Sequence, residues 1–415
     1  MNRRDWLRTM ALAGGTALLP LGQRGWAAAS PAAGDHRRLI VLMLRGAVDG
    51  LSVVVPYGDA DYYKLRSKIA LPRPNSEGGV IDLDGHFGMH PALAPLLPRW
   101  ADGSLAFIHA SGSPAETRSH FEAQDFMETG TPGIATTADG WMNRLLGVLP
   151  GTRNPTTAIS LGNAQPKIVT GRNGVANIAL GRGAARAQAT DRPAVAAAFD
   201  SLYAGDDALS RTYHEGREAR SDLLEDMHTD AHDDPKANGG APSVQGFAQD
   251  AQQLARIMTR DARVRLAFLA VGGWDTHVNQ GAAQGQLANR LRPLGEGLSL
   301  LAKDLGDVYR DTVIVVMSEF GRTAHENGNG GTDHGHGNAM WLMGGGVNGK
   351  KVYGEWPGLD AGSLHEARDL AITTDFREVL GMVCERHVGL GDAATAQVFP
   401  KAPTASARLG KLLRA

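Results

Sequence analysis

The sequence predicts an α/β fold built on a mostly parallel sheet, and three observations carry this prediction. Four short, continuous apolar runs, at 37–44, 104–109, 264–271 and 312–318, are typical of strands that are buried on both faces. A helical leucine pattern lies between the last two runs, so strand, helix and strand form a crossover whose two strands are parallel. A polar loop follows each run, at the edge where parallel α/β sheets bind their ligands.

Two helices are expected, one on each side of the 264–271 strand. The first begins behind Ser243, a residue type that caps helices well, and repeats apolar side chains on one face. These side chains are Val244, Phe247, Ala251, Leu254 and Met258. The second helix carries leucines at steps of four and three, namely Leu287, Leu291, Leu294, Leu298, Leu301 and Leu305.

Two regions depart from this pattern. Residues 131–200 contain short β-like pieces at 156–161, 167–170 and 176–180, separated by Gly, Asn and Pro. We interpret this region as a small inserted subdomain that contains β-structure. Residues 229–243 form a polar linker of Asp, His, Gly and Pro, which predicts a mobile surface loop.

Composition excludes several classes of protein. The 415 residues include a single cysteine, which excludes a disulfide scaffold, and 42% hydrophobic residues, which suffice for a large core. With 42 basic and 44 acidic side chains the formal net charge is −2, whereas a protein that binds nucleic acid is expected to be basic. Glycine is abundant, at 53 residues without a fixed period, and we expect it in tight turns.

The first 29 residues have the three regions of a bacterial signal peptide. Arg3 and Arg4 belong to a basic start, an apolar run follows over 9–21, and small residues end the segment. The paired arginines predict export by the twin-arginine translocase. The apolar run is too short to span a bilayer comfortably. We therefore expect a single mature domain over 30–415, periplasmic or secreted, without a stable membrane anchor.

The polar loops behind the four strands carry side chains that catalyse reactions or bind metals. In chain order these candidates are Arg45, Asp49, Arg118, Ser119, Asp275, His277, Glu319, Asp333, His334 and His336. Because the carboxyl ends of parallel strands lie at one edge of a sheet, we expect the loops to converge on one site.

The acidic and imidazole side chains among these candidates indicate a metal site. Asp275 and His277 are two residues apart and point the same way if the chain is extended. Asp333, His334 and His336 put three potential ligands into four residues beside glycines. Carboxylate and imidazole groups suit zinc, manganese and similar divalent ions. In the alternative, Asp275 caps the following helix and the histidines bind loop carbonyl groups.

Seven motifs, in order along the chain, carry a family resemblance. They are LRGAVDGLS at 44–52, RSHFEAQ at 118–124, GWDTH at 273–277, MSEFGRT at 317–323, GTDHGHG at 331–337, GEWPGL at 354–359 and TDFR at 374–377. Together they resemble the bacterial family called domain of unknown function 1501, which is grouped with the alkaline-phosphatase and sulfatase-like superfamily. The resemblance implies an alkaline-phosphatase-like three-layer sandwich and a metal-assisted hydrolase.

The resemblance also implies roles for single residues. Ser119, with Thr117 as second choice, stands where the superfamily has its nucleophile at a helix start, although Ser119 equally fits a helix cap. Arg118 or Arg45 would neutralise the ester. A divalent ion (zinc, manganese, magnesium or calcium) would be bound by residues drawn from Asp49, Asp275, His277, Glu319, Asp333, His334 and His336.

Two positions depart from the phosphatase pattern. Arg45 stands where phosphatases have a metal-binding Asp, and Phe320 follows Glu319 where they have a His. Asp49 substitutes for the missing carboxylate, or the second metal is absent. His90 and His120 have no assigned role and are interpreted as structural histidines.

Two functions from different classes remain. The first is an exported, metal-dependent hydrolase of phosphate or sulfate esters, with a small-molecule, glycan or lipid ester as substrate. The alternative is a non-catalytic periplasmic binding or assembly protein on a degenerate phosphatase or sulfatase scaffold, since a fold does not determine a function. A third reading is a structural metal that ties the loops together.

Overall fold

The computed structural model describes residues 36–151, 154, 156–179, 193–205, 210 and 237–414. The predicted signal peptide at 1–29 lies outside this part of the chain, as do residues 229–236 of the predicted mobile loop. None of the helices in the described ranges combines the length and the apolarity that crossing a membrane requires.

The centre of the fold is a sheet of nine strands within the described residues. Its order is β11-β5-β10-β9-β1-β8-β6-β7, and β12 pairs with β5. All neighbours are parallel except at β10, which is antiparallel to both β5 and β9. The strands are β1 (Arg38–Leu44), β5 (Leu105–Gly112), β6 (Ala158–Leu161), β7 (Ala176–Ile178), β8 (Leu266–Val271), β9 (Thr312–Ser318), β10 (Asn338–Gly344), β11 (Lys351–Tyr353) and β12 (Thr374–Asp375).

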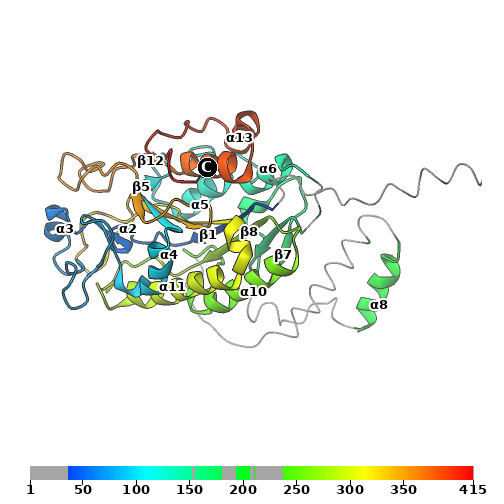
Figure 1. The fold of residues 1–415 in the computed structure, drawn as a ribbon, viewed down its shortest axis with the longest axis horizontal. Helices are drawn as coiled ribbons and strands as arrows, with labels where there is room; N and C mark the ends of the chain where they lie inside the picture. Colours follow the sequence, from blue (N-terminus) through cyan, green and yellow to red (C-terminus); the bar gives the residue numbers. More distant parts are fainter. Residues whose placement is uncertain are drawn as a thin grey trace, which may run out of the picture. The chain divides into compact units, whose positions relative to one another are not determined.

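Helices cover both faces of this sheet, with α10 and α11 on one face and α5, α6 and α13 on the other (Figure 1). The α-helices are α2 (Gly50–Val53), α3 (Ala60–Leu65), α4 (Leu97–Ala101), α5 (His120–Thr129), α6 (Trp141–Val148), α8 (Pro193–Leu202), α10 (Phe247–Arg260), α11 (Gln286–Asp304), α12 (Phe376–Met382) and α13 (Asp392–Val398). Short 3-10 segments are η1 (Pro91–Leu96), η2 (Lys167–Val169), η4 (Val244–Gly246) and η5 (Gly306–Asp311), and η6 (Val383–Val388) is a π-helical turn. The predicted α/β class and the three layers are confirmed.

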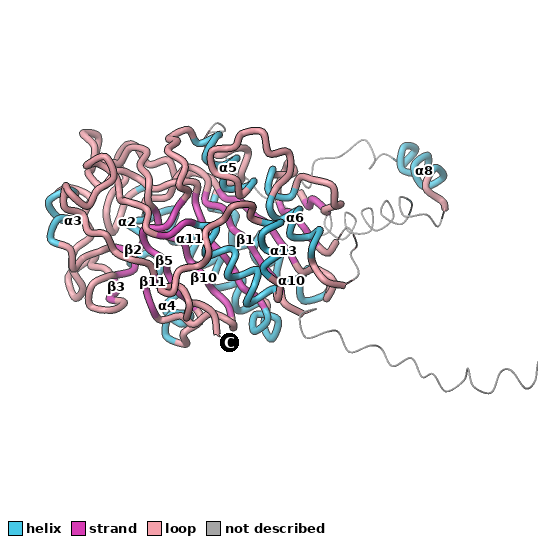
Figure 2. Tube along the Cα trace, turned by 90° about the horizontal axis from the view of Figure 1, so that it is seen from above, coloured by secondary structure: helices cyan, strands magenta, loops and turns pink. Residues whose placement is uncertain are grey.

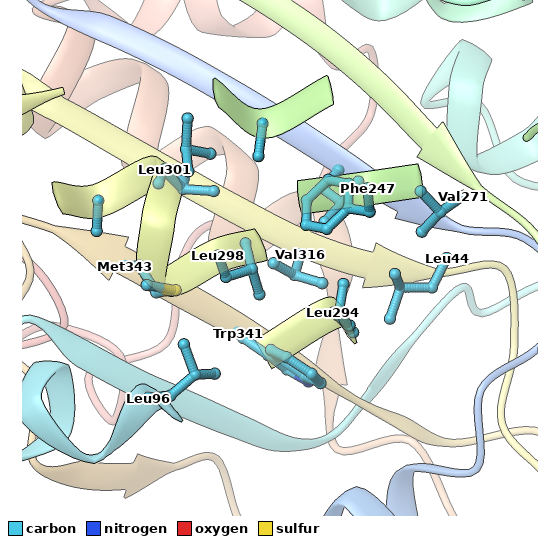
Figure 3. Packing of buried hydrophobic residues seen from close by; sticks show 14 of the residues in the cluster. Leu44, Leu96, Phe247, Val271, Leu294, Leu298, Leu301, Val316, Trp341 and Met343 are labelled. Atoms are coloured by element: carbon cyan, nitrogen blue, oxygen red, sulfur yellow. The ribbon is translucent and has the colours of Figure 1, made fainter. Parts of the chain in front are cut away.

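The apolar runs form central strands because both of their faces are buried. In β1, Ile40, Leu42 and Leu44 belong to the core under α10 and α11, and the alternate residues belong to the opposite core. Figure 3 shows the first core, where Leu294 and Leu298 of α11 lie close to Val316 and Trp341 of the sheet. The leucine periodicity thus predicted the face of α11 that packs on the sheet.

Two strands from 131–200, in the described part of that range, join the edge of the main sheet. β6 pairs with β8 and β7 pairs with β6, both in parallel. Residues 167–169 are a 3-10 turn rather than a strand. A second, antiparallel sheet comes from β2 (Val54–Val55), β3 (Ile81–Asp82) and β4 (Gly88–Met89). Loops make up much of the chain around it, near α2 and α3 (Figure 2).

The strand ends are level where the polar loops begin. In the register of the sheet, Leu44 lies opposite both Val271 and Ser318, so β1, β8 and β9 end together. β5 runs in the same direction, because β10 is antiparallel to both β5 and β9. The loops after these four strands therefore start at one edge.

Candidate metal centre

Three loops meet at this edge and bring two histidines and an aspartate together. His120 is the first residue of α5 after β5, Asp275 follows β8, and His334 lies in the long loop between β9 and β10. One nitrogen of each imidazole and one oxygen of Asp275 all lie within 4.8 Å of one another. The structure thus joins residues that are more than 50 positions apart in the chain.

The donor atoms face each other at short range. His334 Nε2 lies 3.0 Å from His120 Nε2 and 3.3 Å from Asp275 Oδ1, and His120 Nε2 lies 3.6 Å from the same oxygen. His277 adds a third imidazole, with its Nε2 3.0 Å from both His334 Nε2 and Asp275 Oδ1. Ligands of a tetrahedral zinc ion with bonds near 2 Å stand about 3.3 Å apart, which these separations approach.

The second nitrogen of each imidazole is held by an acceptor. His120 Nδ1 lies 2.8 Å from Glu319 Oε1, and His277 Nδ1 lies 3.0 Å from Asp333 Oδ1. His334 Nδ1 lies 2.9 Å from the carbonyl oxygen of Arg118. Metal-binding histidines are oriented in this way by carboxylates and carbonyl groups. Glu319 and Asp333 therefore lie behind the imidazoles rather than among the converging atoms.

Hydrogen bonds and neighbouring charges keep the carboxylates of this site ionised, against the effect of burial. Burial would raise the pKa of Asp275, but hydrogen bonds with His120 and His334 and the charge of Arg322 hold that pKa far below its ordinary value. Burial opposes the charged form of His120, yet hydrogen bonds to Asp275 and Glu319 outweigh it and raise the pKa of His120 to about 9. The pKa of the buried Glu319 is lowered, against its burial, chiefly by its bond to His120. The site is thus suited to bind a cation.

Glycines allow the loops to approach this closely. A Cβ atom on Gly321 would stand 1.8 Å from the carbonyl oxygen of Gly337, and one on Gly335 would stand 2.4 Å from the backbone of Arg322. A Cβ atom on Gly331 would lie 2.4 Å from the backbone of His277. Part of the glycine surplus is therefore required by the packing of backbone against backbone around the site.

Three of the predicted residues lie elsewhere and have other partners. Asp49 is completely buried and forms an ion pair with Arg66 at 2.6 Å, with Ser52 and Gln280 also donating to it. The guanidinium of Arg45 is paired with the buried Glu128. His336 stacks on His365, with 4.4 Å between ring centroids. The structure therefore does not bring Asp49, Arg45 or His336 into the converging group.

Ser119 and Arg118 lie at the rim of the site. Ser119 occupies the N-cap position of α5, is exposed, and its side chain makes no capping hydrogen bond. Arg118 points its guanidinium to Glu366 and Asp369, while its carbonyl group holds His334. Ser119 directly precedes His120 in the chain.

His120 is the site residue that sequence reasoning missed. A single histidine at a helix start forms no spacing pattern with another ligand, so the residues around it gave no reason to prefer a ligand to a structural histidine. One signal was available, because His120 follows Ser119 in the loop that was already expected at this edge. Its partners come from the loops after β8 and β9, and only the fold brings them near.

Several solved structures are similar to part of the chain. The C-terminal periplasmic domain of EcEptC from Escherichia coli, in complex with Zn, is 12% identical, with 74% of this chain and 72% of that chain covered and a TM-score of 0.35. PsFucS1 sulfatase from Pseudoalteromonas sp. is 13% identical, with 90% and 73% covered and a TM-score of 0.36. A protein in the alkaline phosphatase superfamily from Vibrio parahaemolyticus is 10% identical, with 76% and 62% covered and a TM-score of 0.36. No curated protein sequence matches the chain.

A family model covers most of the sequence. The model described as "Protein of unknown function (DUF1501)" matches residues 103–400, more than half of the 415 residues. The matched range includes His120, Asp275, His277 and His334, so the whole converging group belongs to the family domain. The chain is therefore a member of the DUF1501 family of proteins of unknown function.

Proposed function

We propose that the protein is a metal-dependent hydrolase of phosphate or sulfate esters. The observation that carries the proposal is the arrangement of His120, His277 and His334 around one oxygen of Asp275. When each Nδ1–H donates to its acceptor, each Nε2 presents a lone pair to the others and to the carboxylate. Arg322 already donates to this oxygen of Asp275, but the imidazole lone pairs repel one another unless a proton or a second cation lies among them. A divalent cation satisfies all of them at once.

The donor set assigns roles to the chain's own residues. His120, Asp275 and His334 would hold the ion, with His277 beside them. Glu319 and Asp333 orient two of the imidazoles and increase their basicity. A bound metal supplies Lewis-acid stabilisation of an ester oxygen and lowers the pKa of a nucleophile.

Ser119 is the proposed nucleophile. Its side chain is exposed, lies next to His120 and is not used to cap α5. The first amides of α5 would favour an anion at this position. Arg118, from the same loop, would contribute positive charge towards the ester.

The test combines metal content with turnover. We expect purified protein to hold about one equivalent of a divalent metal by elemental analysis, and to hydrolyse an aryl phosphate, a phosphodiester or an aryl sulfate. Ser119→Ala is expected to abolish turnover while metal content stays unchanged, and His334→Ala is expected to remove both. Ser76→Ala, at an exposed serine of another loop, is the matched control. No bound metal, and no turnover after metal supplementation, would refute the proposal.

We also propose that the protein is exported by the twin-arginine translocase. The support comes from Arg3, Arg4 and the apolar run behind them. Replacing both arginines by lysine in the full-length protein should leave it in the cytoplasm, whereas a matched change of the exposed Arg260 and Arg310 should not. Equal export of both variants contradicts this route.

A non-catalytic binding protein is the second candidate, and one observation favours it. Asp49, the residue expected to replace the missing carboxylate of a second metal site, forms a buried ion pair with Arg66. In the described part of the chain only one group of residues is placed to hold a metal, and a two-metal clamp is therefore not supported. A binding protein would keep its cellular phenotype in Ser119→Ala, whereas an enzyme would lose it.

A further inference from the structure

A tight turn over residues 365–369 lies beside the candidate metal centre. His365 and Asp369 exchange backbone hydrogen bonds of 2.9 and 3.0 Å, and the tip between them carries Glu366 and Arg368. The turn is attached to the loop of the metal centre, because the amide of Ala324 donates to the carbonyl of Arg368 at 3.1 Å. The backbone of this turn is therefore tied to the loop that carries His334.

Arg118 and Arg368, the latter a residue of the turn itself, share Asp369, and each is linked to His334 through one backbone carbonyl group. Arg118 Nη2 and Arg368 Nη1 donate to the same oxygen of Asp369, at 3.0 and 3.3 Å. Arg368 Nη2 also donates to the carbonyl of His334 at 2.9 Å, while the carbonyl of Arg118 accepts from His334 Nδ1. The two guanidinium groups thus share one carboxylate oxygen, and that of Arg368 also binds the backbone carbonyl of a proposed metal ligand.

Much of each guanidinium group is available to a ligand. The side chains of Arg118 and Arg368 are 42% and 37% exposed. In the described part of the chain, the hydrogen bonds of Arg118 involve only Nη2, and those of Arg368 leave its Nε–H unused. The free N–H groups of a planar guanidinium suit the oxygens of a phosphoryl or sulfuryl group.

The two carboxylates of the turn differ in burial and so in role. Asp369 is fully buried, and its ion pairs with the arginines are costly to break. Glu366 is 54% exposed, and an exposed ion pair such as Glu366–Arg118 stabilises little. Glu366 and the following Ala367 both have φ of +51°, a left-handed conformation that non-glycine residues rarely adopt. Glu366 is therefore the carboxylate that an incoming anion can replace, and Asp369 is the one that stays.

We propose that Arg118 and Arg368 together bind the oxyanion of the substrate, a phosphoryl or sulfuryl group, and that this anion takes the place of Glu366. Asp369 is the positioning residue that holds the two guanidinium groups side by side. The inference rests on the proposed hydrolase function and deepens it, because it adds Arg368 as a second anion-binding residue and Glu366 as an internal competitor.

The experiment measures the affinity of inorganic phosphate and of inorganic sulfate for the metal-loaded, full-length protein by titration calorimetry. Arg368→Gln should raise the dissociation constant of the preferred anion about ten-fold, because one charge-assisted contact is lost. Arg368→Lys, which keeps the charge, should recover part of this loss. Glu366→Gln should lower the constant about two- to five-fold, because a weak competitor is removed. Arg310→Gln, at an exposed ion pair with Asp307, is the control and should change nothing.

The sign of the Glu366→Gln effect separates anion binding from structural damage, because a merely disturbed turn would not bind an anion more tightly. If the wild type binds an anion but both Arg368→Gln and Glu366→Gln leave its affinity unchanged, the inference is overturned and the hydrolase proposal stands. If the wild type binds neither anion, both are overturned. The two arms of the titration distinguish a phosphoryl from a sulfuryl substrate.

Discussion

Replacing Glu319 by glutamine separates the charge behind the metal centre from its geometry. Glu319 is completely buried, and its Oε1 accepts hydrogen bonds from His120 Nδ1 at 2.8 Å, the amide of Gly46 at 2.8 Å and Gln124 Nε2 at 3.0 Å. Its Oε2 accepts from the hydroxyl of Ser318 at 3.1 Å. Glutamine has the shape of glutamate, its oxygen still accepts hydrogen bonds at this position, and its amide group can donate to the hydroxyl oxygen. The shape is therefore kept, and the negative charge is lost.

The expected effect falls on metal affinity rather than on the fold. Loss of a partner that orients a metal-binding histidine costs about 10- to 100-fold in affinity, or roughly 1.4–2.7 kcal/mol. We expect the upper half of that range for Glu319→Gln, because the carboxylate is buried and its charge is little screened. Asp333→Asn, behind His277, is the comparison, and its side chain is 52% exposed. Its effect should stay below about five-fold.

The assay is a competition for zinc between the protein and a chromophoric chelator, with thermal melting of the metal-free proteins as the control for folding. A weaker zinc affinity for Glu319→Gln is the expected result, with equal melting temperatures above pH 9, where the imidazole of His120 is neutral in both metal-free proteins. An affinity within about two-fold of the wild type would refute the reasoning, because His120 would then not be a ligand that depends on its carboxylate partner.

Three further predictions concern pH, a buried ion pair and a close backbone contact. In the metal-free protein the pKa of His120 is raised from near 6.5 to about 9. The protonated imidazole therefore stabilises the folded state fully below pH 6.5, and this stabilisation is lost as the pH rises through about 9. The melting temperature should fall over that pH range, and a constant or rising melting temperature contradicts the prediction. Asp49→Asn leaves the guanidinium of Arg66 buried without its charge partner and should cost about 3–5 kcal/mol in urea unfolding, whereas a change in metal stoichiometry would show that Asp49 belongs to the metal centre. Gly321→Ala forces a Cβ atom against the carbonyl of Gly337 and should destabilise the protein by about 1–3 kcal/mol and weaken metal binding; unaltered zinc affinity would contradict it.

Local pattern was sufficient for the elements that build the sheet. Strand β1 is apolar from Leu39 to Leu44 and is buried on both faces, and the leucines of α11 repeat at helical spacing. Such signals depend only on neighbours in the chain. The β-pieces after residue 156 were found as short strands, but their place at the edge of the main sheet depends on pairing with β8, about a hundred residues later. A local sequence pattern does not predict which distant strand a given strand will pair with.

The candidate site, too, was predicted from the sequence only in part. The loops were expected at one edge because parallel strands end together, and Asp275, His277 and His334 do lie together there. Glu319 and Asp333 were expected as ligands, but each lies behind an imidazole, and this distinction depends on the direction of single side chains. Residue type alone does not separate a carboxylate that faces a metal from one that faces the back of a histidine.

The sequence by itself determined the α/β class, the main strands and the edge at which the polar loops begin, because burial and periodicity act over a few residues. Only the tertiary structure decided which side chains at that edge converge. The fold brings His120 into the group, pairs Asp49 with Arg66, and lets Arg368 bind the carbonyl group of His334. These contacts join residues from 17 to more than 200 positions apart, and the packing of the whole chain, not any local preference, sets the distances between them.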